Sequence, residues 1–505
     1  MKKLWFCLPV FLGLAACTAP EKMEVERWGR FELVYHESAW SNPFREVKLE
    51  AIFTSPSGHE FQVEGFYDGD GAGGVKGDVF KIRFSPGETG RWSWRTSSGS
   101  AKLDGQQGEF ECVPSDRRGP LTYTPDRPRY LHWASGEIFF ESGPNDPECF
   151  LANGFLTQEQ RFKALDYLAG AGCNILYMGM VNAGPGDGDP EMKVTPWTGG
   201  FDKPNFEDIC LLFMNRLNGV LDHMDSLGMV AHLVFYLDDC CEISKAITPD
   251  QEEMLFHYLV ARFGSYPGIV WNLAEEYEEC FDSAWCASRA ALLHRLDPLQ
   301  HPVTVHQLSS DTFAFPGSPD FDLTATQYNF TDPDSMNKTA LKLRAQLESA
   351  GRPMPVSIIE WTPFSPEQAG EARKGIWAIA TGGGTYQIFN KRDLEPMSAD
   401  FAQWQECWRY AAILKSVMEK LPLDDMAPDN RLVSRGYCLA TPGKAYLAYL
   451  PTGGNFTLDV ESAKESLEAV WIDPRTGERT GAGMVKAGQA SFETPSDQDW
   501  ALLLK

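Results

Sequence analysis

Gly268-Ile269-Val270-Trp271-Asn272-Leu273-Ala274-Glu275-Glu276-Tyr277 is an apolar run that ends in two adjacent carboxylates. A short run of this kind is typical of a strand buried on both faces of a parallel sheet. Comparable runs occur at residues 138–140, 174–180, 230–236, 303–305, 323–327, 356–359 and 385–389. Amphipathic helical patterns separate most of them, at residues 158–169, 206–227, 249–263, 283–296, 335–350 and 367–381. This alternation predicts an α/β fold, a closed (β/α)8 TIM barrel over residues 120–420.

An open, doubly wound sheet is the main alternative for the same alternation of strands and helices. Such sheets usually carry a glycine-rich phosphate loop directly after the first strand. Neither a GxGxxG nor a GxxxxGKS/T motif follows the first apolar run of this sequence. We therefore favour the closed barrel over the open sheet.

The two regions that flank the predicted barrel have a different sequence pattern. Residues 24–115 and 422–505 alternate short β-rich runs with turn signals and show no helical period. Short strands at this spacing are typical of antiparallel sandwiches. We predict an N-terminal β-sandwich over 24–115 and a C-terminal β-sandwich over 422–505.

Residues 1–17 have the pattern of a lipoprotein signal peptide. Two lysines give a positive start, residues 4–14 form an apolar segment, and Leu14-Ala15-Ala16-Cys17 follows. The apolar segment is too short to span a bilayer. Its last four residues resemble the bacterial lipobox, which implies cleavage before Cys17 and lipidation of its side chain. We expect a chain attached to the membrane by lipid at Cys17, in a bacterial cell envelope, periplasmic or facing outward at the outer membrane.

Charge and cysteine content exclude some partners. A formal net charge of −25, from 70 acidic and 45 basic residues, is unsuited to a phosphate backbone, so we expect no nucleic-acid partner. The cysteines lack CxxC spacing, and we expect neither a metal nor a cofactor. In an oxidising compartment some cysteines should pair. Cys240, Cys241, Cys280 and Cys286 follow two adjacent predicted strands, and we predict a disulfide between those loops.

Two predicted barrel strands end in acids. Glu275 and Glu276 end the quoted run, and Glu360 follows residues 356–359. Reactive groups in a barrel sit at the C-terminal ends of strands, so acids after the fourth and seventh strands face each other across its mouth. Hydrolysis of an O-glycosyl bond needs two carboxyl groups, one to protonate the leaving oxygen and one to meet the oxocarbenium-like carbon. We predict Glu276 and Glu360 as the catalytic pair of a glycoside hydrolase.

The expected mechanism is retaining, with Glu360 as nucleophile and Glu276 as acid/base. It needs carboxyl groups about 5–5.5 Å apart, whereas an inverting pair would stand about 6.5–9.5 Å apart. Burial or a like charge, such as that of Glu275, must raise the pKa of Glu276 if it is to hold a proton near neutrality. Two alternatives remain: a barrel that binds carbohydrate on the cell surface without catalysis, and a polysaccharide lyase.

The segment Trp271-Asn272-Leu273-Ala274-Glu275-Glu276 resembles the strand-four motif of clan A glycoside hydrolases, Trp-x-Leu-Gly-Asn-Glu. The resemblance implies that Glu276 is the acid/base and that Glu275 replaces the asparagine that binds the sugar 2-hydroxyl. Ala274 replaces the glycine of that motif. The two departures leave Glu275 open as the alternative acid/base.

The whole chain resembles apiosidase-like glycoside hydrolases of polysaccharide-degrading bacteria. Residues 80–86 and 90–95 are similar to the N-terminal β-sandwich of unknown function that often precedes the barrel in that group. Residues 471–477 and 499–504 are similar to the small C-terminal domain described, by analogy, as collagen-binding. The resemblance implies a plant or algal poly- or oligosaccharide as substrate, without fixing the sugar.

Further polar residues at predicted strand ends are candidate substrate-binding groups, because they can bind sugar hydroxyls. They are Glu275, Asp238, Asp239, His306, Gln327, Tyr328 and Gln387, with Trp361 as a ring that could stack on a sugar. His306 lacks the second histidine or acid spacing of a metal ligand. The sequence has no GxSxG elbow for a nucleophilic serine. The sugar and linkage depend on loop shapes that the sequence does not give.

Overall fold

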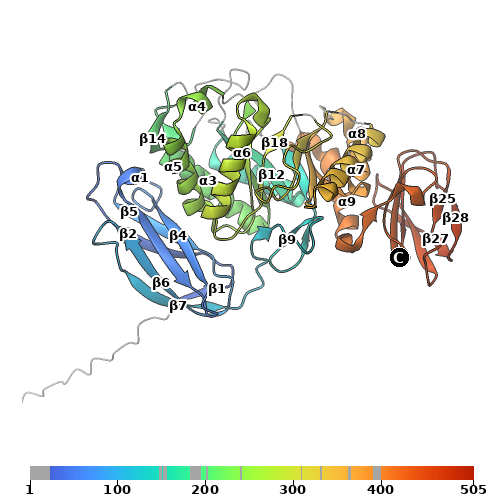
Figure 1. Cartoon of the computed structure of the whole chain (residues 1–505). Helices are drawn as coiled ribbons and strands as arrows, with labels where there is room; N and C mark the ends of the chain where they lie inside the picture. Colours follow the sequence, from blue (N-terminus) through green and yellow to red (C-terminus); the bar gives the residue numbers. More distant parts are fainter. Residues whose placement is uncertain are drawn as a thin grey trace, which may run out of the picture.

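A computed structural model describes residues 23–146, 150–151, 156–181, 195–200, 203–238, 241–308, 310–329, 332–361, 365–389 and 400–505. The predicted signal peptide, Cys17 and Asp239 lie outside these ranges. The described chain has a central unit of parallel strands and helices with a β-sheet unit on each side (Figure 1).

The central sheet closes on itself. Its strands are β11 (Ser142–Asn145), β12 (Ile175–Val181), β15 (Val230–Tyr236), β16 (Ile269–Ala274), β17 (Val303–Thr304), β18 (His306–Gln307), β19 (Ala325–Gln327), β20 (Val356–Glu360) and β21 (Gly384–Phe389). They pair in parallel in the order β17-β16-β15-β12-β11-β21-β20-β19-β18. Because Val305 alone separates β17 from β18, the two ends of this order belong to one run of chain and complete a ring. This barrel-like arrangement favours the closed fold over the open sheet.

Helices cover the outside of the ring in the described part of the chain. They are α2 (Gln158–Gly170), α3 (Leu211–Leu227), α4 (Cys241–Ala246), α5 (Pro249–Phe263), α6 (Ser283–Leu296), α7 (Pro333–Ser349), α8 (Ala369–Thr381) and α9 (Gln405–Met418). Threonines begin α2 and α5 with capping boxes, since Thr157 and Thr248 accept from the third helical amide of each. None of these helices is long and apolar enough to cross a bilayer.

One helix prediction needs correction. Residues 206–209 were expected to begin a helix, but β14 (Asn205–Ile209) pairs with β13 (Trp197–Thr198), and α3 begins only after Cys210. The alternating exposure of β14 is that of a strand at the surface. Between β18 and β19 the described residues carry no helix, so strict alternation of strand and helix is lost there.

The first barrel strand also differs from the prediction at residues 138–140. β10 (Ile138–Phe139) instead pairs antiparallel with β9 (Leu131–Trp133), which pairs with β8 (Leu121–Thr122). The apolar side chains of this small sheet pack on Ile175, Val230, Val270 and Leu323, near the starts of barrel strands. The small sheet therefore closes the N-terminal end of the barrel, and β11 is the first strand of the ring.

The N-terminal unit is a curled sheet. Its elements are β1 (Glu24–Glu26), β2 (Phe31–His36), α1 (Pro43–Glu46), β3 (Leu49–Thr54), β4 (Glu60–Tyr67), β5 (Val79–Phe84), β6 (Gly90–Ser98) and β7 (Gln107–Val113). The strand order is β1-β7-β6-β3-β4-β5-β2, yet Phe31 of β2 stacks on Phe110 of β7 with ring centroids 4.1 Å apart. A buried ion pair joins this unit to α5, because Arg262 Nη1 lies 2.7 Å from Asp68 Oδ1.

The C-terminal unit has two sheets around its own core. The larger sheet has the order β22 (Ala427–Pro428), β23 (Tyr437–Thr441), β24 (Ala445–Leu450), β29 (Trp500–Leu504), β26 (Leu467–Ile472) and β27 (Arg479–Val485), and the smaller pairs β25 (Asn455–Asp459) with β28 (Gln489–Glu493). Arg373 of α8 binds Asp499 through two hydrogen bonds of 2.8 and 3.0 Å. Trp377 of α8 stacks on Tyr449. Both flanking units are β-sheet structures, and the sandwich architecture stays a prediction for each.

Candidate active site

The three acids singled out from the sequence lie at the C-terminal rim of the ring. Glu275 directly follows β16, and its amide donates to the Tyr236 carbonyl of β15 over 2.8 Å. Glu360 ends β20, and its carbonyl accepts from the Tyr328 amide over 2.8 Å. Glu275 and Glu360 are 5% and 7% exposed. Glu276 is half-buried and has a left-handed backbone with φ of 40°, which is uncommon outside glycine, asparagine and aspartate.

Gln327 connects the two predicted catalytic acids. Its Nε2 donates to Glu360 Oε1 over 2.5 Å. Its side chain also hydrogen-bonds the Glu276 carboxylate. One amide at the end of β19 therefore touches the acids that follow β16 and β20. This contact brings Glu276, Glu360 and Gln327 into one polar group at the rim.

Glu276 is the acid in this group whose pKa is raised toward 7. Burial raises its pKa from 4.5 to about 7, and the negative charges of Asp238, Glu279 and Glu278 act in the same direction. The hydrogen bond from Gln327 opposes these effects. Asp238, rather than the expected Glu275, is the leading like charge. A carboxyl group with such a pKa can hold a proton near pH 7 and release it during a reaction.

His306 lies between the other two acids. Its Nδ1 is 2.9 Å from the Tyr177 hydroxyl and 3.9 Å from Glu275 Oε1, and its Nε2 is 3.8 Å from Glu360 Oε2. Burial lowers the pKa of His306 to about 3, so the imidazole is neutral at physiological pH. The contacts with the carboxylates are therefore polar contacts of a neutral ring and not ion pairs.

Beneath the rim, the barrel interior holds a chain of buried polar side chains. Gln387 Nε2 contacts Glu141 Oε1 and lies 2.8 Å from His232 Nδ1. His232 Nε2 lies 3.0 Å from Asn272 Nδ2, and Asn272 Oδ1 accepts from the His306 amide over 3.1 Å. This chain runs from β21 to the histidine beside Glu360.

Two predicted substrate-binding residues are placed away from the rim. Trp361 is 0% exposed, and its ring occupies the space where a Cβ on Gly375 of α8 would lie. Because side chains alternate along a strand, Glu360 and Trp361 point to opposite faces, so the expected stacking on a sugar is wrong. Gln387 is also fully buried, and its contacts are with Glu141 and His232 rather than with the mouth.

The other predicted residues keep their positions near the mouth. Gln327 and His306 contact Glu360, Tyr328 follows β19 directly, and Asp238 lies close to Glu276 and Glu279. Their roles in substrate binding stay predictions.

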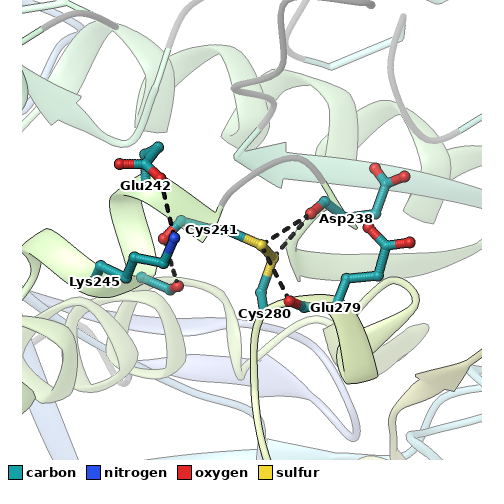
Figure 2. Close-up of a disulfide and its surroundings, with 7 residues drawn as sticks. Asp238, Cys241, Glu242, Lys245, Glu279 and Cys280 are labelled. Carbon is teal, nitrogen blue, oxygen red and sulfur yellow. Dashed lines mark hydrogen bonds and ion pairs between the residues drawn. A yellow bond between two sulfur atoms is a disulfide. The ribbon is translucent and has the colours of Figure 1, made fainter.

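A disulfide joins the loops after β15 and β16, as the sequence predicted. Cys241 and Cys280 are bonded, with Cα atoms 4.8 Å apart. Cys286 is a buried free cysteine, and Cys240 lies outside the described residues. Figure 2 shows Asp238 and Glu279 beside this bond. The crosslink therefore ties together the two loops that carry the acidic neighbours of Glu276.

Two groups of three residues have ligand atoms close enough to share a cation. Glu275, His306 and Glu360 form one group, and Asp238, Glu276 and Glu279 form the other, with ligand atoms within 4.8 Å of one another in each. Each group includes one of the predicted catalytic acids. A bound cation would hold that acid as a ligand and lower its availability for proton transfer or attack. The expectation of a reaction without a metal stays a prediction.

The sequence interpretation missed the interior chain of Glu141, Tyr177, His232 and Asn272. Three of these are polar residues inside otherwise apolar strand runs, Tyr177 in β12, His232 in β15 and Asn272 in β16. A polar residue in such a run must find a partner when buried, which is the signal that points to an interior network. Glu141 directly follows the predicted strand at residues 138–140, and the rule that selected Glu360 was not applied to it.

Two family models match the regions on either side of the barrel by sequence, and solved structures resemble the chain in fold. Residues 24–99 match the family described as "Domain of unknown function (DUF5060)". Residues 422–505 match the family described as "Putative collagen-binding domain of a collagenase". No curated protein matches the chain.

Several solved structures share the fold. The chain is similar to a "putative glycoside hydrolase" from Bacteroides vulgatus ATCC 8482, with a TM-score of 0.79, 19% identity, and 96% of this chain and 100% of that chain covered. It is also similar to a glycoside hydrolase family 5 structure from the same organism, with a TM-score of 0.63, 14% identity and coverage of 77% and 93%. At such identities the likeness concerns the fold alone. The chain therefore has the barrel-like α/β architecture that these glycoside hydrolases share.

Proposed function

We propose that this protein is a retaining glycoside hydrolase in which Glu276 is the acid/base and Glu360 the nucleophile. The observation that carries the proposal is the shared contact with Gln327, together with the raised pKa of Glu276. Burial raises the pKa of Glu276 to about 7, so this acid can hold a proton near pH 7, and Gln327 donates to Glu360 as well as to Glu276. This reaction requires one carboxyl group that can donate a proton and a second carboxyl group beside it.

The first step transfers the sugar to the protein. Glu276 donates its proton to the glycosidic oxygen while a carboxylate oxygen of Glu360 bonds to the anomeric carbon, and the bond to the leaving group breaks. In the second step Glu276, now ionised, takes a proton from water, whose oxygen attacks the same carbon and releases Glu360. Two displacements at one carbon retain its configuration.

Gln327 and Glu275 complete the proposed machinery. The Gln327 amide orients Glu360 and limits the rise in the pKa of Glu276. By resemblance to the strand-four motif, Glu275 contacts the sugar 2-hydroxyl. Glu275 Oε1 lies 3.9 Å from Nδ1 of the neutral His306, and a carboxylate can accept hydrogen bonds from sugar hydroxyls.

The substrate class and location are proposed from the sequence. The resemblance to apiosidase-like enzymes favours a plant or algal poly- or oligosaccharide. The lipobox at Cys17 favours a lipid-anchored protein of a bacterial cell envelope, and the disulfide between Cys241 and Cys280 suits an oxidising compartment. Cys17→Ser should move the protein from the membrane fraction to the soluble fraction; unchanged membrane association would contradict a lipid anchor.

Release of reducing ends from a panel of plant and algal polysaccharides tests the activity. We expect Glu360→Gln and Glu276→Gln to lose at least about 100-fold in kcat, since nucleophilic and acid–base steps each contribute on that order. Glu242→Gln is the matched control, because this acid lies in the first turn of α4 and is 91% exposed. Equal activity of Glu360→Gln and wild type would refute the assignment of the nucleophile.

The alternatives give different products from the same panel. A non-catalytic binding protein would bind a glycan and release no sugar, and a lyase would form an unsaturated product that absorbs ultraviolet light. Hydrolysis that needs Glu360 is the outcome expected here.

A further inference from the structure

The barrel interior contains an acid that the proposed reaction does not use. Glu141 lies just before β11 and is 4% exposed. Its Oε2 accepts from Ser357 Oγ over 2.5 Å and from Thr385 Oγ1 over 2.8 Å, and its Oε1 contacts the amide of Gln387. None of these partners is a cation. The protonation state of Glu141 therefore depends on how donors and acceptors are shared along the chain from Gln387 to His306.

The directions of these hydrogen bonds are fixed at the His306 end of the chain. The His306 amide donates to Asn272 Oδ1, which fixes the orientation of the Asn272 side chain and points its Nδ2 at His232 Nε2. An amide nitrogen is a donor only, so His232 Nε2 must be the acceptor. A neutral imidazole carries one proton, which then lies on Nδ1. His232 is neutral because burial, reinforced by His306, lowers its pKa to about 3.

The Nδ1 proton determines the next contact. The Gln387 atom 2.8 Å from His232 Nδ1 must accept that proton, so it is the amide oxygen, and the amide is rotated by half a turn from the assigned orientation. The same oxygen then faces Glu141 Oε1. Two oxygens in contact need a proton between them, and Glu141 is the group that can supply it.

We infer that Glu141 is a protonated, uncharged carboxylic acid that acts as a positioning residue, fixing the Gln387 amide so that its oxygen accepts from Nδ1–H of His232. Through Asn272 this arrangement holds the backbone of His306 beside Glu360. Burial raises the pKa of Glu141, in agreement with the geometry. The titratable groups near it are Tyr386 of the adjacent strand β21 and, through Gln387, His232 of β15, and the structure gives it no charged neighbour among the described residues.

Nitrogen-15 spectra of protein labelled at histidine test this inference without any substrate. The chain has nine histidines, and the His232 signals are those lost in His232→Asn. We expect Nδ1 of His232 to be protonated and Nε2 unprotonated, with no change between pH 5 and 8. An Nε2–H tautomer in the wild-type protein would overturn the inference, because Gln387 could then keep its assigned orientation and Glu141 its charge.

Glu141→Gln supplies the second measurement. Glutamine presents an N–H donor to Gln387 and an oxygen acceptor to Ser357 and Thr385, as the neutral acid does. We expect the His232 tautomer to persist in Glu141→Gln, and in Glu141→Leu we expect the His232 Nδ1–H signal to shift, because Gln387 loses the donor that holds its amide oxygen toward Nδ1. Loss of the tautomer in Glu141→Gln would refute the role of the neutral acid. If either variant fails to fold, the wild-type spectrum decides alone, and neither result depends on whether the protein hydrolyses glycans.

Discussion

Replacing Glu276 by glutamine should stabilise the protein at alkaline pH and leave its stability unchanged at acidic pH. Burial, aided by Asp238, raises the pKa of Glu276 from 4.5 to about 7. Below about pH 4.5 the carboxyl is protonated in both folded and unfolded chains and has no cost. As pH rises from 4.5 toward 7 the unfolded chain releases this proton first, and the folded state loses stability until both are ionised.

The magnitude follows from that displacement of the pKa. A tenfold change in proton affinity is worth about 1.4 kcal/mol, so the full displacement corresponds to roughly 3 kcal/mol. Because Glu276 is only half-buried, solvent screening reduces this cost to about 1–2 kcal/mol. Glutamine has no charge to bury. We therefore expect Glu276→Gln to gain about 1–2 kcal/mol over wild type at pH 8 relative to pH 4.5.

Urea unfolding followed by tryptophan fluorescence at the two pH values measures this difference. Glu242→Gln is the control, since its side chain is 91% exposed and should show no pH-dependent gain. A gain of the same size at both pH values would show that the carboxyl has no raised pKa, which would refute the argument for Glu276 as the proton donor.

Three further predictions concern the rim and the joints between units. Activity should fall as pH rises above about 7, because Glu276 must be protonated to donate its proton. In Gln327→Ala the pH at which activity falls should be higher, because the hydrogen bond that lowers the pKa of Glu276 is lost, and kcat should also decrease. A pH–rate profile of both proteins measures these changes. A profile in Gln327→Ala that matches wild type would contradict the shared contact. Reduction of the Cys241–Cys280 disulfide, or Cys241→Ser, should lower the free energy of unfolding by up to about 4 kcal/mol, because the bond closes a loop of 39 residues. Denaturant titration with and without dithiothreitol tests this. An unchanged unfolding midpoint would show that the disulfide does not stabilise the fold. Arg373→Met should lower the free energy of unfolding by about 3–5 kcal/mol, because it removes the cation that neutralises the buried Asp499. It should also make the chain near residue 421 sensitive to protease. Protease resistance equal to that of the wild type would mean that this ion pair does not hold the C-terminal unit.

The barrel could be predicted because its strands and helices differ in hydrophobic period. The misplacement of the first strand has a physical reason. β11 reads Ser-Gly-Pro-Asn, and its small and polar residues do not form the apolar run expected of a buried strand, whereas Ile138 and Phe139 do. These two residues are apolar because they seal the end of the barrel.

The candidate acids could be predicted from strand ends, but their environment could not. Successive side chains of a strand point to opposite faces of the sheet. Extending this pattern past Ile359 would have placed Glu360 and Trp361 on opposite faces from the sequence alone. The raised pKa of Glu276 depends on burial at the rim and, secondarily, on Asp238, which lies in another loop. The left-handed backbone at Glu276 carries no sequence signal, since glutamate rarely adopts it.

Trapping the glycosyl-enzyme intermediate tests the central claim most directly. A 2-deoxy-2-fluoro glycoside of the sugar that the polysaccharide panel identifies should slow the second step and leave the sugar attached to the nucleophile. We expect a mass increase of one fluorosugar, located by peptide mapping at Glu360 and absent in Glu360→Gln. Attachment to Glu275 or another residue, with Glu360→Gln still labelled, would contradict it.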